Sequence, residues 1–263
     1  MTNIPNRTDL ISLARAGGEI AKSFFQIDVK AEWKGDKTPL TQADQDINDM
    51  VIDALSECED LFVLGEEGTG GTKGARYSLL VDPIDGTFPF KTGTPNSAVV
   101  LCLFDGLVPI IGVIYDFMLD RMWSAQRGVG AWMNGEAITV SPNHNLEQSQ
   151  VCAVWWHGCD YNMHQVVGEA MKDFAVFNPI SIAYFGGILA SGGIEATIFP
   201  GRNAWETGAM EVLVTESGGQ ATNIHGERIA YRWDGDNIVT DGHIMSNGGP
   251  VHSHLVNTVK NNN

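Results

Sequence analysis

Segments with a helical spacing of apolar residues alternate with short apolar runs along this chain, and this alternation restricts the fold more than any other feature. The predicted helices cover 8–26, the segment that opens at Thr41, 161–174 and 204–217. The predicted strands cover 61–64, 78–81, 99–104, 108–115, 121–124, 130–133 and 151–156. Elements in this order favour a layered α/β (α+β) fold over a sandwich or a helical bundle.

Length and composition support a globular protein built from two halves. The chain has 263 residues, of which 43% are hydrophobic and 18% charged, and a chain of this size buries roughly 70–75% of its unfolded surface. The polar stretch 141–145 divides an N-terminal α+β half, 1–142, from a C-terminal α/β half, 143–263. Four glycines in 68–74 predict an exposed, mobile loop there.

The charge balance excludes two classes of partner. The chain has 16 basic and 32 acidic residues, which gives it a formal charge of −16. This negative charge repels nucleic acid and anionic lipid. No apolar run approaches the ~20 residues of a membrane span, and the first residues lack a signal-peptide pattern. We therefore expect a cytoplasmic protein without nucleic-acid or membrane partners. The four cysteines show no metal or disulfide spacing and are expected to be free thiols.

Acidic residues follow two of the predicted strands. Glu66-Glu67 ends the first, and the segment Asp82-Pro-Ile-Asp-Gly-Thr87 ends the second. Carboxylates at strand ends lie at the rim of a sheet, where ligands bind in such folds. Carboxylates that crowd together repel one another unless a cation lies between them, and oxygen ligands suit Mg²⁺ or Mn²⁺. The alternative from this motif alone is a solvated acidic turn.

Several ordered motifs give the chain a resemblance to a known family. They are Lys37-Thr-Pro-Leu-Thr-Gln-Ala-Asp44, Gly65-Glu66-Glu67, Asp82-Pro-Ile-Asp-Gly-Thr87, Gly112-Val-Ile-Tyr115, Gly128-Val-Gly-Ala131 with Asn134-Gly135, and Trp205-Glu-Thr-Gly-Ala209 with Val214-Thr-Glu-Ser-Gly-Gly219. Together they resemble the inositol monophosphatase family, within the lithium-sensitive, magnesium-dependent phosphatases. The resemblance implies an alternating α/β/α/β/α sandwich, a site between the two halves and a homodimer.

The resemblance also implies roles for individual residues. Glu67, Asp82 and the carbonyl of Ile84 would hold one Mg²⁺, and Asp82, Asp85 and Glu206 a second, with two or three ions per site and Mn²⁺ as a possible substitute. Glu67 and Thr87 would position a water that attacks the phosphate, while Asp44 orients Thr87 and Lys37 lies nearby. The substrate contacts would be Asp85, Gly86, Thr87, Ser181, Phe199 and Arg202.

Two positions depart from the family pattern. Glu206 stands where the family usually has an aspartate metal ligand, so it either binds metal with a longer side chain or only faces a helix N-terminus. Phe199 stands where many inositol phosphatases have a glutamate that contacts sugar hydroxyls. The implied substrate is a small sugar or inositol-type phosphate, with histidinol phosphate, fructose 1,6-bisphosphate and 3′-phosphoadenosine 5′-phosphate as alternatives.

Two other functions fit parts of the sequence. Asp85-Gly86-Thr87 is similar to the end of the haloacid-dehalogenase motif, but the carboxylates are three residues apart rather than two. A non-catalytic binding or regulatory protein on the same scaffold is favoured only by Glu206. A further feature, Trp155-Trp156-His157, is interpreted as an apolar strand end rather than a site.

Overall fold

An eight-stranded sheet is the largest of the four sheets in the described part of the computed structural model, which covers residues 4–27, 29–33, 39–156 and 158–262. Its order is β10 (Glu136–Ala137), β9 (Gly130–Met133), β8 (Arg121–Gln126), β7 (Val108–Asp116), β6 (Ala98–Asp105), β5 (Tyr77–Asp85), β3 (Leu61–Gly65) and β4 (Gly68–Gly71). Neighbouring strands are antiparallel except β3 and β5, which are parallel.

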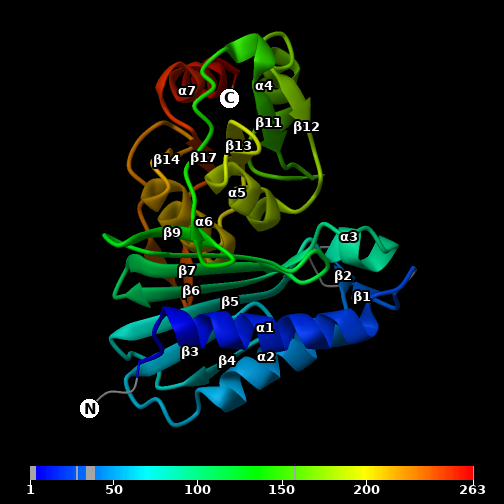
Figure 1. The fold of residues 1–263 in the computed structure, drawn as a ribbon, viewed down its shortest axis with the longest axis vertical. Helices are drawn as coiled ribbons and strands as arrows, with labels where there is room; N and C mark the ends of the chain where they lie inside the picture. The colour runs from blue at the N-terminus through cyan, green and yellow to red at the C-terminus, as the bar shows by residue number, and fades with distance from the viewer. Residues whose placement is uncertain (1–3, 28, 34–38, 157, 263) are drawn as a thin grey trace.

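Two helices cover the outer face of this sheet (Figure 1): α1 (Arg7–Phe24) and α2 (Gln42–Ala54). Each begins with a capping box, formed by Asn6 with Asp9 and by Thr41 with Asp44, which satisfies backbone N–H groups that a helix start leaves unpaired. Their apolar stripes pack on alternate residues of the strands, such as Leu79 and Val81 of β5. The helices predicted over 8–26 and after Thr41 are therefore confirmed.

A five-stranded sheet forms the second sheet. Its order is β12 (Ala175–Phe177), β11 (Gln150–Ala153), β13 (Ala196–Phe199), β17 (His243–Ser246) and β14 (Gln220–Asn223). The first three strands are parallel, and β17 is antiparallel to β13 and β14. Helices α4 (Met163–Ala170) and α7 (Gly249–Asn262) pack on its outer face in one apolar cluster.

The middle layer consists of α5 (Ile182–Ala190) and α6 (Ala204–Glu216), which lie between the two sheets (Figure 1). One buried cluster joins both sheets to these helices, from Leu80 and Trp123 through Met210 to Met245. The molecule is thus the predicted α/β/α/β/α sandwich. The division at residue 142 stays a prediction, although the larger sheet uses only strands before it and the smaller only strands after it.

Short elements complete the described chain: β1 (Glu32–Trp33), β2 (Pro39–Leu40), α3 (Thr87–Thr92), a 3₁₀ turn (Leu146–Gln148), β15 (Arg232–Asp234) and β16 (Asn237–Val239). Within the described ranges, no helix has the length and apolar character needed to cross a membrane. The four cysteines are free thiols, as expected.

The loop predicted over 68–74 is wrong in its first part. Residues Gly68–Gly71 form the edge strand β4, with Gly65 opposite Gly68 and Phe62 opposite Gly71. Strand pairing is made by backbone groups, so the segment pairs although it lacks the alternating side chains that identify a strand. Glu66-Glu67 becomes the two-residue turn of this hairpin.

Candidate active site

A cavity of about 260 Å³ opens between the end of β5 and helices α5 and α6. Its acidic lining comes from Glu66, Asp82, Asp85 and Glu206. The side chains of a strand alternate between its two faces, so Asp82 shares the face of Leu80, which packs in the cluster with α5 and α6. The fold therefore turns the carboxylates of the central motif toward the middle layer.

A bulge shapes the end of β5. Asp82 lies opposite Val100 and Asp85 opposite Ala98, so three steps along β5 match two along β6. An extra residue bends a strand and changes where its side chains point, and Pro83 needs no ladder bond there because it has no N–H. Gly86 follows with φ 80° at the start of α3, and a Cβ there would lie 2.8 Å from the Cβ of Ser181. Only glycine fits this turn between the motif and α5.

The carboxylates destabilise one another's charged forms. Asp82 is buried, and burial raises its pKa well above the ordinary value, with further contributions from Glu66, Glu206 and Asp85. Burial also raises the pKa of Glu206, which lies in the first turn of α6, and Asp85 raises it further. Asp82 Oδ1 and Glu206 Oε2 are buried without a hydrogen-bond partner among the described residues. Buried oxygens of this kind are costly unless something pairs with them.

Asp85 is held by the start of α5. Its carboxylate accepts hydrogen bonds from Ser181 Oγ (2.7 Å) and from the backbone N–H groups of Tyr184 (2.9 Å) and Ile182 (3.1 Å). Burial raises the pKa of Asp85 to about 6, and these hydrogen bonds limit the rise. Asp85 therefore fixes the middle layer to the central motif. Ser181, predicted to contact substrate, is buried in this contact and does not line the cavity.

Asp44 and Thr87 make other contacts than predicted. Asp44 Oδ2 accepts from the backbone N–H (2.8 Å) and hydroxyl (2.6 Å) of Thr41, while Thr87 Oγ1 donates to the carbonyl of Ile84 (3.2 Å). Asp44 thus caps α2 instead of orienting the hydroxyl of Thr87. Burial raises the pKa of Asp44 to about 7, helped by Glu66 and Glu67.

Glu66 is the acidic residue of the hairpin turn that reaches the cavity, and Glu67 is not among the lining residues. The backbone N–H of Glu66 donates to the carbonyl of Val81 (3.0 Å), next to Asp82. The sequence signal that Glu66 reaches the site was its place directly after the strand β3. The parallel register of β3 with β5 puts Gly65 opposite Val81, so Glu66 follows at the same end as Asp82. Lys37, predicted near this turn, lies outside the described residues.

The acidic wall fits a divalent cation. The described chain contains no group of three His, Cys, Asp or Glu side chains already arranged to hold a metal, and Asp85 is occupied by α5. The unpaired oxygens of Asp82 and Glu206 nevertheless form an oxygen donor set that an ion would satisfy. Mg²⁺ is bound in proteins by one or two carboxylates together with waters and phosphate oxygens. The metal roles of Asp82, Asp85, Glu206 and the Ile84 carbonyl stay predictions.

The remaining cavity wall is largely apolar. Of the predicted substrate contacts, Gly86, Thr87, Phe199 and Arg202 line the cavity. The sequence interpretation missed Trp156, which lines the same cavity and is 44% exposed, so it is no buried strand end. Its position at the end of the strand predicted over 151–156 was a signal that it lies at the sheet rim.

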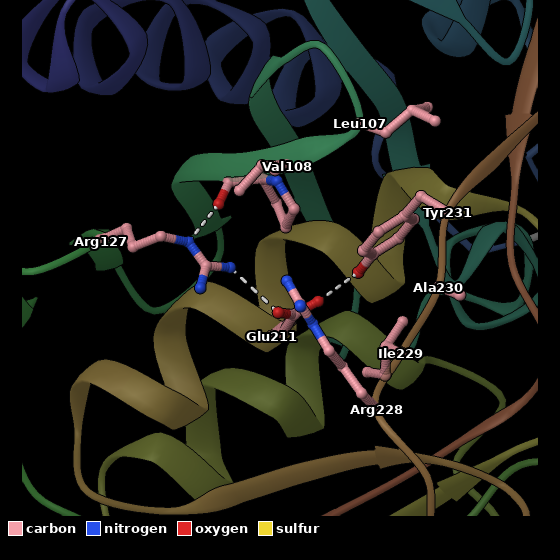
Figure 2. A pocket seen from close by; sticks show the side chains of 9 residues that line it. Leu107, Val108, Arg127, Glu211, Arg228, Ile229, Ala230 and Tyr231 are labelled. Carbon is pink, nitrogen blue, oxygen red and sulfur yellow. Dashed lines mark hydrogen bonds and ion pairs between the residues drawn. The ribbon is translucent and has the colours of Figure 1, made fainter.

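A second cavity, of about 250 Å³, contains a carboxylate whose two oxygens both have partners, the side chain of Glu211 (Figure 2). Glu211 accepts from Arg127 Nη2 (3.0 Å) at one oxygen and from the Tyr231 hydroxyl (2.7 Å) at the other. Arg127 also donates through Nε to the carbonyl of Pro109 (2.7 Å). Both oxygens of Glu211 are therefore paired, whereas Asp82 and Glu206 each keep one unpaired oxygen.

Sequence comparisons match almost the whole chain. A family model described as the inositol monophosphatase family matches residues 6–261. The histidinol-phosphatase of Mycobacterium tuberculosis is 28% identical over 245 residues, covering 88% of this chain and 92% of that protein. Inositol monophosphatase 1 of Xenopus laevis is 26% identical over 224 residues, covering 80% of this chain and 79% of its own length.

Solved structures show the same fold. The IMPase of Thermotoga maritima superposes with a TM-score of 0.82 at 24% identity, covering 97% of each chain. The extragenic suppressor protein suhB of Bartonella henselae superposes with a TM-score of 0.83 at 22% identity, covering 95% of this chain and 96% of that one.

Proposed function

Because this chain belongs to the inositol monophosphatase family and is therefore a phosphoric monoester hydrolase, we propose that it releases phosphate from a small phosphorylated metabolite with Mg²⁺ as cofactor. The observation that supports this most is the pair of unpaired buried oxygens, Asp82 Oδ1 and Glu206 Oε2, in one acidic cavity. Buried carboxylates that repel each other are stable as charged groups only beside a cation.

The residues that line the cavity have different roles in this proposal. Asp82, Glu206 and Glu66 would hold the cation, and Glu66 would take the metal role that the family resemblance gives to Glu67. Asp85 fixes α5 against the motif and presents its carboxylate at the same end of the cavity. Gly86 and Thr87 line the cavity beside Ile84 and would border the phosphate.

The chemistry that Mg²⁺ supplies when bound is neutralisation of phosphoryl oxygens and a lowered pKa of a coordinated water. A phosphate dianion is repelled by Asp82, Asp85 and Glu206 alone, so the carboxylates bind it only together with the cation. The middle layer excludes bulk water from the floor of the site, where Asp82 is 3% exposed. Attraction between unlike charges is stronger in such a water-poor site.

The substrate is a phosphate monoester of a small alcohol. Relatives include histidinol-phosphatases, inositol monophosphatases, a fructose-1,6-bisphosphatase/inositol-1-monophosphatase and a 3′(2′),5′-bisphosphate nucleotidase. The phosphate end of the cavity suits all of these substrates. Phe199 offers no acceptor to sugar hydroxyls, which disfavours myo-inositol phosphate among them.

Release of inorganic phosphate from a panel of these esters tests the proposal. We expect release with Mg²⁺, none in chelator, and recovery when Mg²⁺ is restored. Lithium should inhibit, as in the family that the chain resembles. Light scattering should give about twice the 28.5 kDa of one chain if the homodimer forms. A folded protein that releases no phosphate from any ester with Mg²⁺ would refute the proposed function.

A further inference from the structure

The wall of the active-site cavity away from the carboxylates carries large apolar side chains that water reaches. Trp156 is 44% exposed, Phe88 42% and Ile180 45%, and all three line this cavity. Exposed apolar side chains scattered singly need no explanation, but several in one cavity indicate a ligand surface.

Trp156 is backed by a second aromatic ring. The ring centroids of Trp156 and Phe199 lie 5.9 Å apart at 51°, and Phe199 also contacts the ring of His243 at 5.4 Å. Gly201 leaves the space that Phe199 fills, because a Cβ there would lie 2.2 Å from the end of the ring. Phe199 is therefore fixed in place and supports the exposed face of Trp156.

Ile180 is held at the cavity in a backbone conformation that is uncommon for a β-branched residue, with φ 56°. Its N–H donates to Asn178 Oδ1 (3.0 Å), and the preceding carbonyl, of Pro179, accepts from Asn96 Nδ2 (3.0 Å). Strained backbone of this kind persists where the surroundings enforce it and clusters at ligand sites. Here it places an apolar side chain in the cavity wall.

Polar side chains are few on this wall. Arg202 and Asn203 line the cavity, and the guanidinium of Arg202 lies 3.8 Å from the carboxylate of Asp160. A polyol placed against Trp156, Phe199 and Ile180 would lose hydrogen bonds to water without replacing them. A flat apolar group would instead cover the exposed tryptophan face.

From this wall we infer the substrate class, an inference that rests on the proposed function: the alcohol part of the phosphate ester carries a planar aromatic or heteroaromatic group that packs on Trp156. The phosphate lies at the carboxylate end, and the ring lies on the apolar wall. Trp156 is then a specificity-determining residue that contributes through binding and not through the hydrolysis step.

Three alkyl phosphates with similar leaving groups test the inference: 2-phenylethyl phosphate, 2-cyclohexylethyl phosphate and glycerol 1-phosphate. With Mg²⁺ present, we expect kcat/KM for the phenyl ester to exceed that for the glycerol ester by roughly 10- to 100-fold, the range of discrimination that a hydrophobic pocket gives. The cyclohexyl ester should fall between them, because it is apolar but not flat.

Trp156→Leu should bring the phenyl and glycerol esters to within about threefold of each other, and Trp156→Phe should keep most of the preference. Trp233→Leu is the matched control, since Trp233 is equally exposed at 44% and is not a lining residue. Equal kcat/KM for phenyl and glycerol esters, or a preference that survives Trp156→Leu, would overturn this inference alone. No phosphate release from any ester would instead refute the proposed function, and this inference with it.

Discussion

Replacing Asp44 with asparagine should change how the stability of the metal-free protein depends on pH. Asp44 is 2% exposed, and burial together with Glu66 and Glu67 raises its pKa from 3.8 to about 7. Below pH 3.8 the carboxyl is protonated in both the folded and unfolded states and costs nothing. As pH rises toward 7 the unfolded state ionises first, so the folded state loses stability.

The size of this loss follows from the two pKa values. A pKa raised from 3.8 to about 7 destabilises the folded state by about 4 kcal/mol once pH is above 7. Roughly 2–3 kcal/mol of this accumulates between pH 5 and pH 8. Asparagine carries no charge, and its amide oxygen still accepts from the N–H of Thr41, so α2 keeps its cap.

Urea unfolding in chelator, followed by tryptophan fluorescence from pH 5 to pH 8, measures the effect. The free energy of unfolding of Asp44→Asn minus that of the wild type should rise by roughly 2–3 kcal/mol across this range. Every other group titrates in both proteins, so the difference isolates Asp44 and its coupling to Glu66 and Glu67. Asp49→Asn, an exposed change on the same helix, is the control and should stay within about 0.5 kcal/mol of wild type. A difference that is constant with pH would refute the reasoning.

Three further predictions concern the site and its support. Glu206→Asp should keep phosphate release with an unchanged or lower Mg²⁺ requirement, while Glu206→Gln should lower kcat/KM by about 10²-fold at limiting Mg²⁺. A Mg²⁺ titration of phosphate release measures both effects. Equal titration curves for Glu206→Gln and the wild type would contradict a metal role for Glu206. Asp85→Ala should lower the free energy of unfolding by about 2–4 kcal/mol, because it leaves N–H groups of α5 unpaired. Urea unfolding measures this loss, and a loss below about 0.5 kcal/mol would contradict the prediction. Burial lowers the pKa of His252 from 6.5 to about 4, so the contribution of His252 to the free energy of unfolding should be full above pH 6.5 and fall by up to about 3 kcal/mol as pH drops to 4. His252→Gln should remove this contribution to the acid slope measured by urea unfolding, and a slope equal to that of the wild type would show that His252 does not cause it.

Local signals in the sequence were enough for six of the eight strands of the larger sheet and for helices α1, α2, α4 and α6. The helical spacing of apolar residues after Thr41 identified α2, because that spacing is set within one helix. The apolar runs 99–104 and 108–115 identified β6 and β7, which pair in a hairpin. Edge strand β4 was not predicted, because its backbone groups pair with β3 although its side chains show no alternating pattern.

The same distinction between local sequence signals and tertiary structure applies to the candidate site. The sequence by itself determined the motif Asp82-Pro-Ile-Asp-Gly-Thr87 and the family, because order and spacing of residues are properties of the chain. Only the tertiary structure decided that Glu66 rather than Glu67 lines the cavity, that Asp85 holds α5, and that Trp156 lines the same cavity. These outcomes depend on strand register, a bulge and the approach of α5 and β13, segments about a hundred residues from the motif. Contacts at that separation follow from how layers pack, which no local pattern records.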